Sequence, residues 1–264
     1  MDCKSETAIL LRGVSQGNNL GRQDAVEGVR GPLEVFPDCR LWRSRSGNDD
    51  RNSLLERMAL GMDEGFEHEL KRIVKPYLDR GRPGDYEHTL RAVAYGKELL
   101  HHEDGDEGIV IPALYLHDIG WGEVDFEDFI YLPLPSQRRY VASVDLHMRH
   151  GASRAKQILD KLGYPMEETQ TVVSIIAVHD RPEKIFAMEN PSAIIVFEAD
   201  YLDKFGLKSL HRFEIMFKDN PGTEVTKKDG AAHLRKGMKV WFKTGTARRL
   251  ALQLAKESGL LEGI

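Results

Sequence analysis

Residues 109–120 read IVIPALYLHDIG, and this stretch decides how the rest of the sequence is interpreted. It predicts a short helix over 109–119 that is apolar on almost every side and must therefore be buried, with Gly120 as a natural end. The helix carries His117 and Asp118 into the interior, where a buried imidazole and carboxylate each need a compensating partner. A divalent cation compensates both at once, and the negative end of the helix dipole favours it.

The flanking segments show the same helical periodicity. Upstream, apolar residues recur at spacings of three and four from Phe66 to Tyr77, and a second helix is expected from Asp85, as its N-cap, to Glu103. Downstream, helices are expected at 149–162, 166–179, 192–205 and 209–217, with two more between about 226 and 258. Residues 121–137 are expected to form a loop over a site. No segment alternates as a strand does, so the predicted fold class is all-α, a helical bundle.

The chain divides into three expected parts. Residues 1–60 are rich in Gly, Arg, Asn, Asp and Ser without a sustained period, which predicts a disordered extension. Residues 61–220 carry the periodic helices and the chemistry. Residues 221–264 are expected to add C-terminal helices that pack on this domain.

Composition excludes several classes of protein. Residues 61–220 hold 19 basic and 29 acidic side chains, and this acidic centre suits a protein that concentrates cations, so no nucleic-acid partner is predicted. The two cysteines, Cys3 and Cys39, lie in the extension and do not indicate a disulfide framework. No apolar run approaches the roughly 18–20 residues that cross a bilayer. These features predict a cytoplasmic protein without a membrane partner, and they leave its oligomeric state open.

Further residues repeat the pattern of 117–118. A second His-Asp pair, His179-Asp180, ends another apolar helix, and His88 lies on the first long helix of the region. Asp200 interrupts the apolar run 194–202, where an unpaired carboxylate would be costly. A metal ion or an arginine must therefore compensate the negative charge of Asp200.

The order His88, His117-Asp118, His150, His179 and Asp200 resembles the HD superfamily, together with the flanking residues His150-Gly151-Ala152 and Glu198-Ala199-Asp200-Tyr201-Leu202-Asp203. This resemblance covers about residues 66–218. It implies a helical bundle that holds one or two divalent metals, with four minimal ligands: His88, His117, Asp118 and Asp200. His150 and His179 would complete a second metal position bridged by Asp118, or else line the pocket and contact phosphate or donate a proton. His147, three residues before His150, is able to substitute for it.

The resemblance also implies a reaction. A metal-activated water would attack a small phosphorylated substrate, with a nucleotide as the leading candidate. The expected catalytic residues are Asp118, His150, His179 and Arg181, and mixed His and carboxylate ligands admit Mn, Fe, Co, Ni and Zn, with Mg less natural for imidazole. Other cations near the motifs are Arg149, Arg154, Lys184 and Lys204. Two alternatives stay open: a two-iron oxygenase of the same superfamily, and a non-catalytic HD sensor or binding module.

Overall fold

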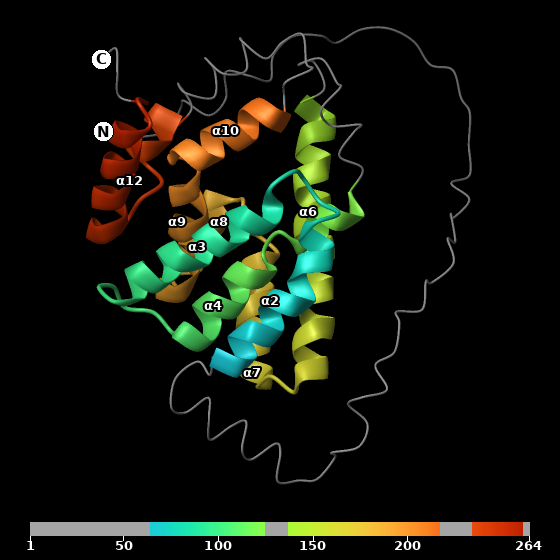
Figure 1. The fold of residues 1–264 in the computed structure, drawn as a ribbon. Coiled ribbons are helices and arrows are strands. Elements are labelled where there is room, and N and C mark those ends of the chain that lie inside the picture. Colours follow the sequence, from blue (N-terminus) through green and yellow to red (C-terminus); the bar gives the residue numbers. More distant parts are fainter. Residues whose placement is uncertain (1–63, 125–136, 217–233, 261–264) are drawn as a thin grey trace, which may run out of the picture. The chain divides into compact units, whose positions relative to one another are not determined.

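The computed structural model describes residues 64–124, 137–216 and 234–260 (Figure 1). Within these residues the regular elements are helices and no strand occurs, which confirms the all-α fold class. The helices are α2 (Glu64–Leu78), α3 (Asp85–Leu100), α4 (Glu107–Leu116), the 3-10 helix η2 (Ile119–Glu123), α6 (Gln137–Leu162), α7 (Met166–Ile176), α8 (Pro182–Ala187), α9 (Pro191–Asp203), α10 (Leu207–Met216) and α12 (Gly245–Glu257). The expected extension, residues 1–60, lies outside the described residues, as does most of the expected loop at 121–137.

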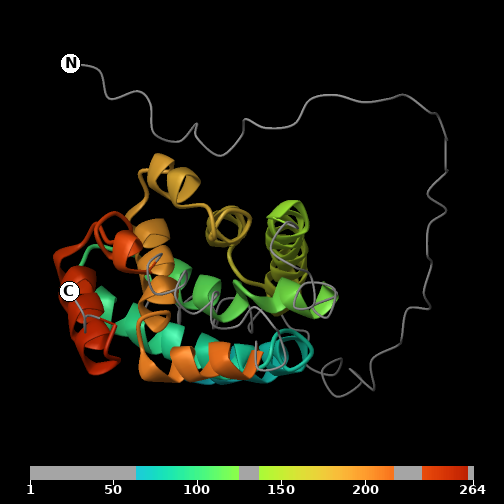
Figure 2. The same cartoon turned by 90° about the horizontal axis from the view of Figure 1, so that it is seen from above.

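The short helix α4 is the centre of the bundle. It packs against α2, α3, α7 and α9, as the views in Figures 1 and 2 show, and every residue from Val110 to Leu116 is buried. A helix that is apolar all round requires such surroundings, and each large side chain buried in this way stabilises the fold by about 1.5–3 kcal/mol. At Gly96 of α3 an added Cβ would come within 2.3 Å of Leu114 Cδ1. The absence of a side chain there lets α3 lie directly against α4.

Helices α3 and α9 pack side by side, and α6 packs against both α7 and η2. In this way the bundle gathers the first turn of α3, the end of α4, the end of α7 and the second half of α9 around one point. The C-terminal helix α12 packs on α9. Buried Glu198 of α9 accepts hydrogen bonds from the backbone of Lys243 and Thr244 just before α12 begins.

Several helix ends differ from the sequence prediction. Helix α4 ends at Leu116, not at 119, because His117 closes it and Asp118 leaves the helical conformation to begin η2. Gly84, with φ of 76°, caps α3 in place of Asp85, whose carboxylate faces back to Arg82 instead. Helix α6 begins at Gln137, twelve residues before the expected start. A helix start without a strong capping residue leaves little local signal.

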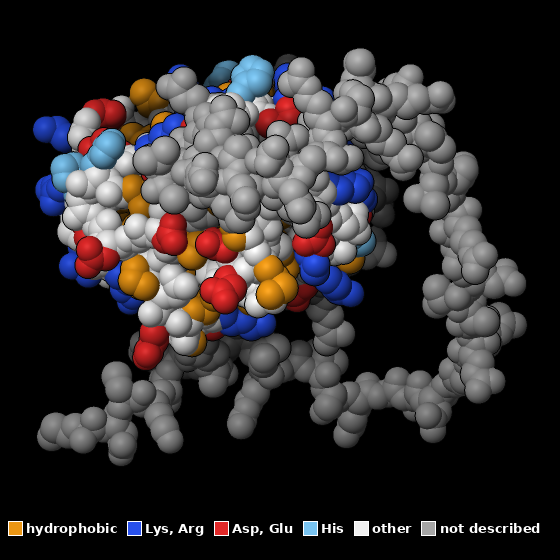
Figure 3. Space-filling view, turned by 90° about the horizontal axis from the view of Figure 1, so that it is seen from below, with side chains coloured by type: hydrophobic (Ala, Val, Ile, Leu, Met, Phe, Trp, Pro, Cys, Tyr) orange, Lys and Arg blue, Asp and Glu red, His pale blue; other side chains and the backbone are white. Residues whose placement is uncertain are grey.

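The surface is of mixed charge. On the face drawn in Figure 3, acidic and basic side chains lie among isolated hydrophobic ones wherever the described residues are in view. Among the described residues, no helix combines the length and the apolar character that crossing a bilayer requires.

Candidate metal centre

Four side chains meet where α3, α4 and α9 come together. His88 Nε2 lies 3.3 Å from His117 Nε2 and 3.0 Å from Asp200 Oδ1. Asp118 Oδ2 lies 3.6 Å from His88 Nε2 and 3.4 Å from His117 Nε2. Ligand bonds of about 2.0–2.2 Å place two ligands of one ion roughly 3–3.5 Å apart. His88, His117 and Asp118 therefore match the spacing that a single divalent ion needs, and Asp200 lies beside the two imidazoles.

A second group forms on the other oxygen of Asp118. His147 Nε2 and His179 Nε2 lie 3.3 Å apart, at 3.7 and 3.6 Å from Asp118 Oδ1. Both imidazoles are buried. Asp180 also belongs to this second group, because its Oδ2 lies 3.5 Å from His147 Nε2. Asp118 thus serves two adjacent groups with separate oxygens, the arrangement of a carboxylate that bridges two ions.

The imidazoles are oriented by their outer nitrogens. His117 and His179 each donate from Nδ1 to the carbonyl oxygen three residues earlier, at 2.8 and 2.9 Å. His88 Nδ1 donates to Asp203 Oδ2 at 2.7 Å. A proton held on Nδ1 leaves the lone pair of Nε2 directed into the cluster. Neutral imidazoles whose lone pairs face each other at 3.3 Å need a positive charge between them, and a metal ion fits this donor set.

The electrostatics of the cluster favour a positive charge at this point: burial works to lower the pKa of His117 and of His88, but the neighbouring carboxylates outweigh it and raise both. Burial works to raise the pKa of Asp118, but Arg82 and His117 outweigh it and hold that pKa well below its usual range. Burial also works to raise the pKa of Asp200, but nearby cations, chiefly Lys204, outweigh it and hold that pKa well below its usual range. Burial and the nearby His179 lower the pKa of His147 to about 3. Ionised carboxylates and a neutral imidazole are the forms that bind metal.

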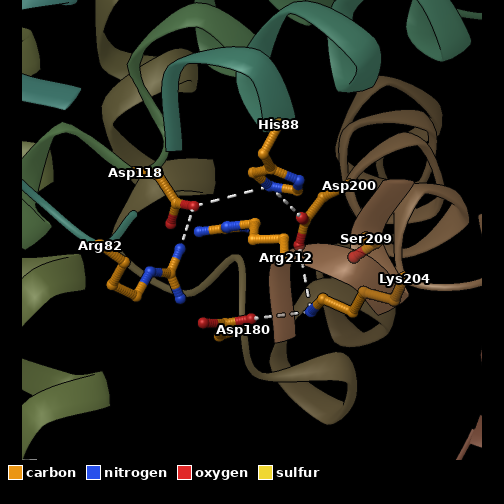
Figure 4. Close-up of a pocket in the computed structure, with 8 residues that line it drawn as sticks. All are labelled: Arg82, His88, Asp118, Asp180, Asp200, Lys204, Ser209 and Arg212. Carbon is orange, nitrogen blue, oxygen red and sulfur yellow. Dashed lines mark hydrogen bonds and ion pairs between the residues drawn. The ribbon is translucent and has the colours of Figure 1, made fainter. Parts of the chain in front are cut away.

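A cavity of about 50 Å³ opens directly onto this cluster (Figure 4). Its wall includes three cationic side chains from separate elements: Arg82 before α3, Lys204 at the end of α9, and Arg212 on α10. The remaining wall residues are His88, Asp118, Asp180, Asp200 and Ser209. A cavity that joins ionised metal ligands to three cations is suited to a small anion.

Comparison with known protein families identifies the domain that holds these residues. Residues 85–204 match the family model described as HD domain. Residues 85–204 therefore form an HD domain of the HD superfamily. No curated protein and no solved structure matched the chain. The matched segment runs from the first residue of α3 to the residue after α9, so this HD domain contains both ligand groups.

The HD domain brings together most of the expected site residues: His88, His117, Asp118, His179 and Asp200. His150 is not among them. Its Nδ1 lies 2.9 Å from Glu123 Oε2, and its side chain is 36% exposed. His147 takes the place beside His179, and the candidate ligand set changes accordingly.

The spacing on α6 explains the difference. His147 shares the buried face of the helix with Val144 and Met148, whereas His150 lies about 4.5 Å further along the axis, beside the end of η2. His147 and Met148 lie three and four residues after Val144, and this helical spacing was the signal in the sequence that could have identified His147.

Arg181, one of the expected catalytic residues, also lies elsewhere. Its Nη2 pairs with Asp145 Oδ1 at 2.6 Å, and it does not line the cavity. Arg82 and Arg212 hold the positions facing the HD cluster, and neither was singled out from the sequence. Lys204, named as a candidate cation, does line the cavity and lies 3.5 Å from Asp200 Oδ2.

Proposed function

We propose that this HD domain is a metal-dependent phosphohydrolase that acts on a small phosphorylated molecule, with a nucleotide as the leading candidate. One observation carries the proposal: the cavity that reaches the shared carboxylate of Asp118 is also lined by Arg82, Lys204 and Arg212. A phosphoryl group is the common biological anion that requires both divalent metal and several cationic side chains at one point. The membership in the HD superfamily supports the same reaction class.

Divalent ions held by the ligand groups would supply an activated water and neutralise charge on phosphate. The protein's own residues position the substrate. Cationic side chains on three sides of the cavity favour entry of an anion, and their burial strengthens each interaction. Asp180 lines the same wall and, although burial opposes it, Lys204 and His179 lower its pKa. The ionised Asp180 is the group we assign to orient the attacking water, by accepting a hydrogen bond from it.

The proposal is tested by metal analysis of the purified protein together with a screen of phosphomonoesters and phosphodiesters. We expect bound transition metal and hydrolysis of at least one phosphate ester under anaerobic conditions. Asp118→Ala should abolish both, whereas Asp160→Ala should change neither, because Asp160 is an exposed carboxylate that pairs with Lys156 on the surface of α6.

Two results would overturn the proposal. Loss of substrate only in the presence of oxygen, with two irons bound, would make the protein an oxygenase. Tight metal binding without turnover of any phosphate ester would leave a sensor or binding module.

A further inference from the structure

Asp85, the first residue of α3, is a fully buried carboxylate that holds two arginines. Its Oδ2 accepts the backbone N–H of Arg82 at 2.7 Å, and its Oδ1 accepts Arg82 Nε at 3.1 Å. The same Oδ1 accepts Nη2 of Arg212, which lies 127 residues further along the chain. A buried carboxylate with three donors is a rigid anchor.

Each arginine has a second support. The guanidinium of Arg82 lies over the ring of Trp121, 4.2 Å from its centroid, and its Nη2 contacts Asp118. Arg212 Nε donates to the carbonyl oxygen of Pro83 at 2.8 Å. Figure 4 shows both side chains reaching toward Asp118 from different sides of the cavity. Their orientation is therefore fixed before any substrate binds.

The two guanidinium groups lie close enough to repel each other. Burial and the nearby Arg82 lower the pKa of Arg212, as expected for two like charges held together. Asp85 pairs with both guanidinium groups, and Asp118 pairs with Arg82. No contact among the described residues uses Nη1 of either arginine. Two aligned guanidinium edges with unused donors form a suitable site for the oxygens of a phosphoryl group.

We propose that Arg82 and Arg212 bind the non-reacting oxygens of the substrate's phosphoryl group, and that Asp85 is the positioning residue that aligns them. This inference rests on the proposed function, because it specifies how the same cavity holds its anion. Asp85 itself does not line the cavity, so its effect on binding must pass through the two arginines.

The probe is inorganic phosphate, titrated by calorimetry into the metal-loaded protein and into protein treated with chelator. Arg212→Gln should raise the Kd for phosphate about tenfold to 100-fold, because a charge-assisted hydrogen bond is lost. Asp85→Asn should raise it by a similar factor, through misalignment of both arginines. For a substrate that the enzyme turns over, Asp85→Asn should raise KM more than it lowers kcat, while metal content stays at the wild-type level.

Two control variants separate positioning from folding. Glu198→Gln removes another fully buried carboxylate, which holds the backbone before α12 and does not line the cavity. It should lower Tm without changing the phosphate Kd. Arg248→Gln removes an arginine that, like Arg212, donates from Nε to a backbone carbonyl, and it should leave phosphate binding unchanged.

The proposal fails if Asp85→Asn behaves like Glu198→Gln, with a lower Tm and an unchanged Kd. It also fails if Arg212→Gln binds phosphate with the same Kd as the wild type. This second test remains valid even if the Asp85→Asn variant does not fold. Because phosphate binding needs no turnover, this experiment still tests the arginine pair if every hydrolysis assay is negative. That negative result would count against the proposed function alone.

Discussion

His147 and His179 face each other across 3.3 Å, and both Nε2 atoms lie within 3.7 Å of the same oxygen of Asp118. His150, on the same helix as His147, instead pairs with Glu123. We therefore expect His147→Ala to remove one metal ion per chain, while His150→Ala keeps the full complement. Inductively coupled plasma mass spectrometry of the two purified variants measures this directly.

The comparison is internally controlled because the two histidines lie on one helix and are truncated in the same way. Circular dichroism should show both variants folded. Equal metal content in the two variants would show that the His147 group holds no ion, and loss of metal only in His150→Ala would reverse the assignment.

The fold was more predictable than the site for a physical reason. Helix class and the central place of α4 follow from local patterns, since residues 110–116 are apolar on all sides and can only be buried. The choice between His147 and His150 depends on which face of α6 meets α7 and η2, a tertiary contact. Arg82 and Arg212 meet through Asp85, which lies 127 residues before Arg212 in the chain, and no local sequence pattern indicates such a contact.

Asp203 orients His88, and its removal should weaken the metal centre. Its Oδ2 accepts the Nδ1 proton of His88 at 2.7 Å, while Arg91 Nε donates to Oδ1 at 2.6 Å. Loss of such an outer partner of a metal ligand lowers metal affinity by about 10- to 100-fold. We expect Asp203→Ala to show this loss in a competition titration with a chromogenic chelator, and Asp203→Asn to lose less, because an amide oxygen still accepts the proton.

A matched control is Asp160→Ala on the exposed side of α6. An unchanged affinity in Asp203→Ala would mean that His88 keeps its orientation without this hydrogen bond, and the assigned role of Asp203 would be withdrawn.

Gly120 sets the distance between η2 and α6. An added Cβ would lie 1.9 Å from the carbonyl oxygen of His147 and 2.5 Å from the backbone nitrogen of Gly151. Backbone atoms cannot rotate away, so α6 must shift. We expect Gly120→Ala to lower the free energy of unfolding by about 3 kcal/mol, at the upper end of the usual overpacking range, measured by urea denaturation.

Gly245, the first residue of α12, offers the contrast, because the nearest atom to its added Cβ is Arg249 Nη1 at 3.8 Å. Gly245→Ala should stay within about 0.5 kcal/mol of the wild type, as most surface changes do. Equal stabilities for the two variants would show that α6 and η2 are not held as closely as the structure describes.

Glu67 of α2 should make stability depend on pH. Burial works to raise its pKa, but hydrogen bonds from Lys97 and Tyr115 outweigh this and lower it below the ordinary value of 4.5. A carboxyl group with a lowered folded-state pKa contributes stability that is present above its unfolded pKa and is lost as pH falls through the folded pKa. Glu67→Gln should therefore be less stable than the wild type at pH 7 by about 1 kcal/mol, a modest value because Lys97 is partly exposed.

Urea denaturation from pH 7 to pH 3 checks the sign of this effect. The gap between the wild type and Glu67→Gln should narrow as pH falls below about 4.5, because Glu67 then takes up a proton and becomes uncharged like glutamine as pH passes its lowered folded-state pKa. Glu183→Gln, at an exposed position on α8, should show no gap at either end of the range. A gap that stayed constant down to pH 3, or widened, would mean that the charge of Glu67 does not stabilise the contact between α2, α3 and α4.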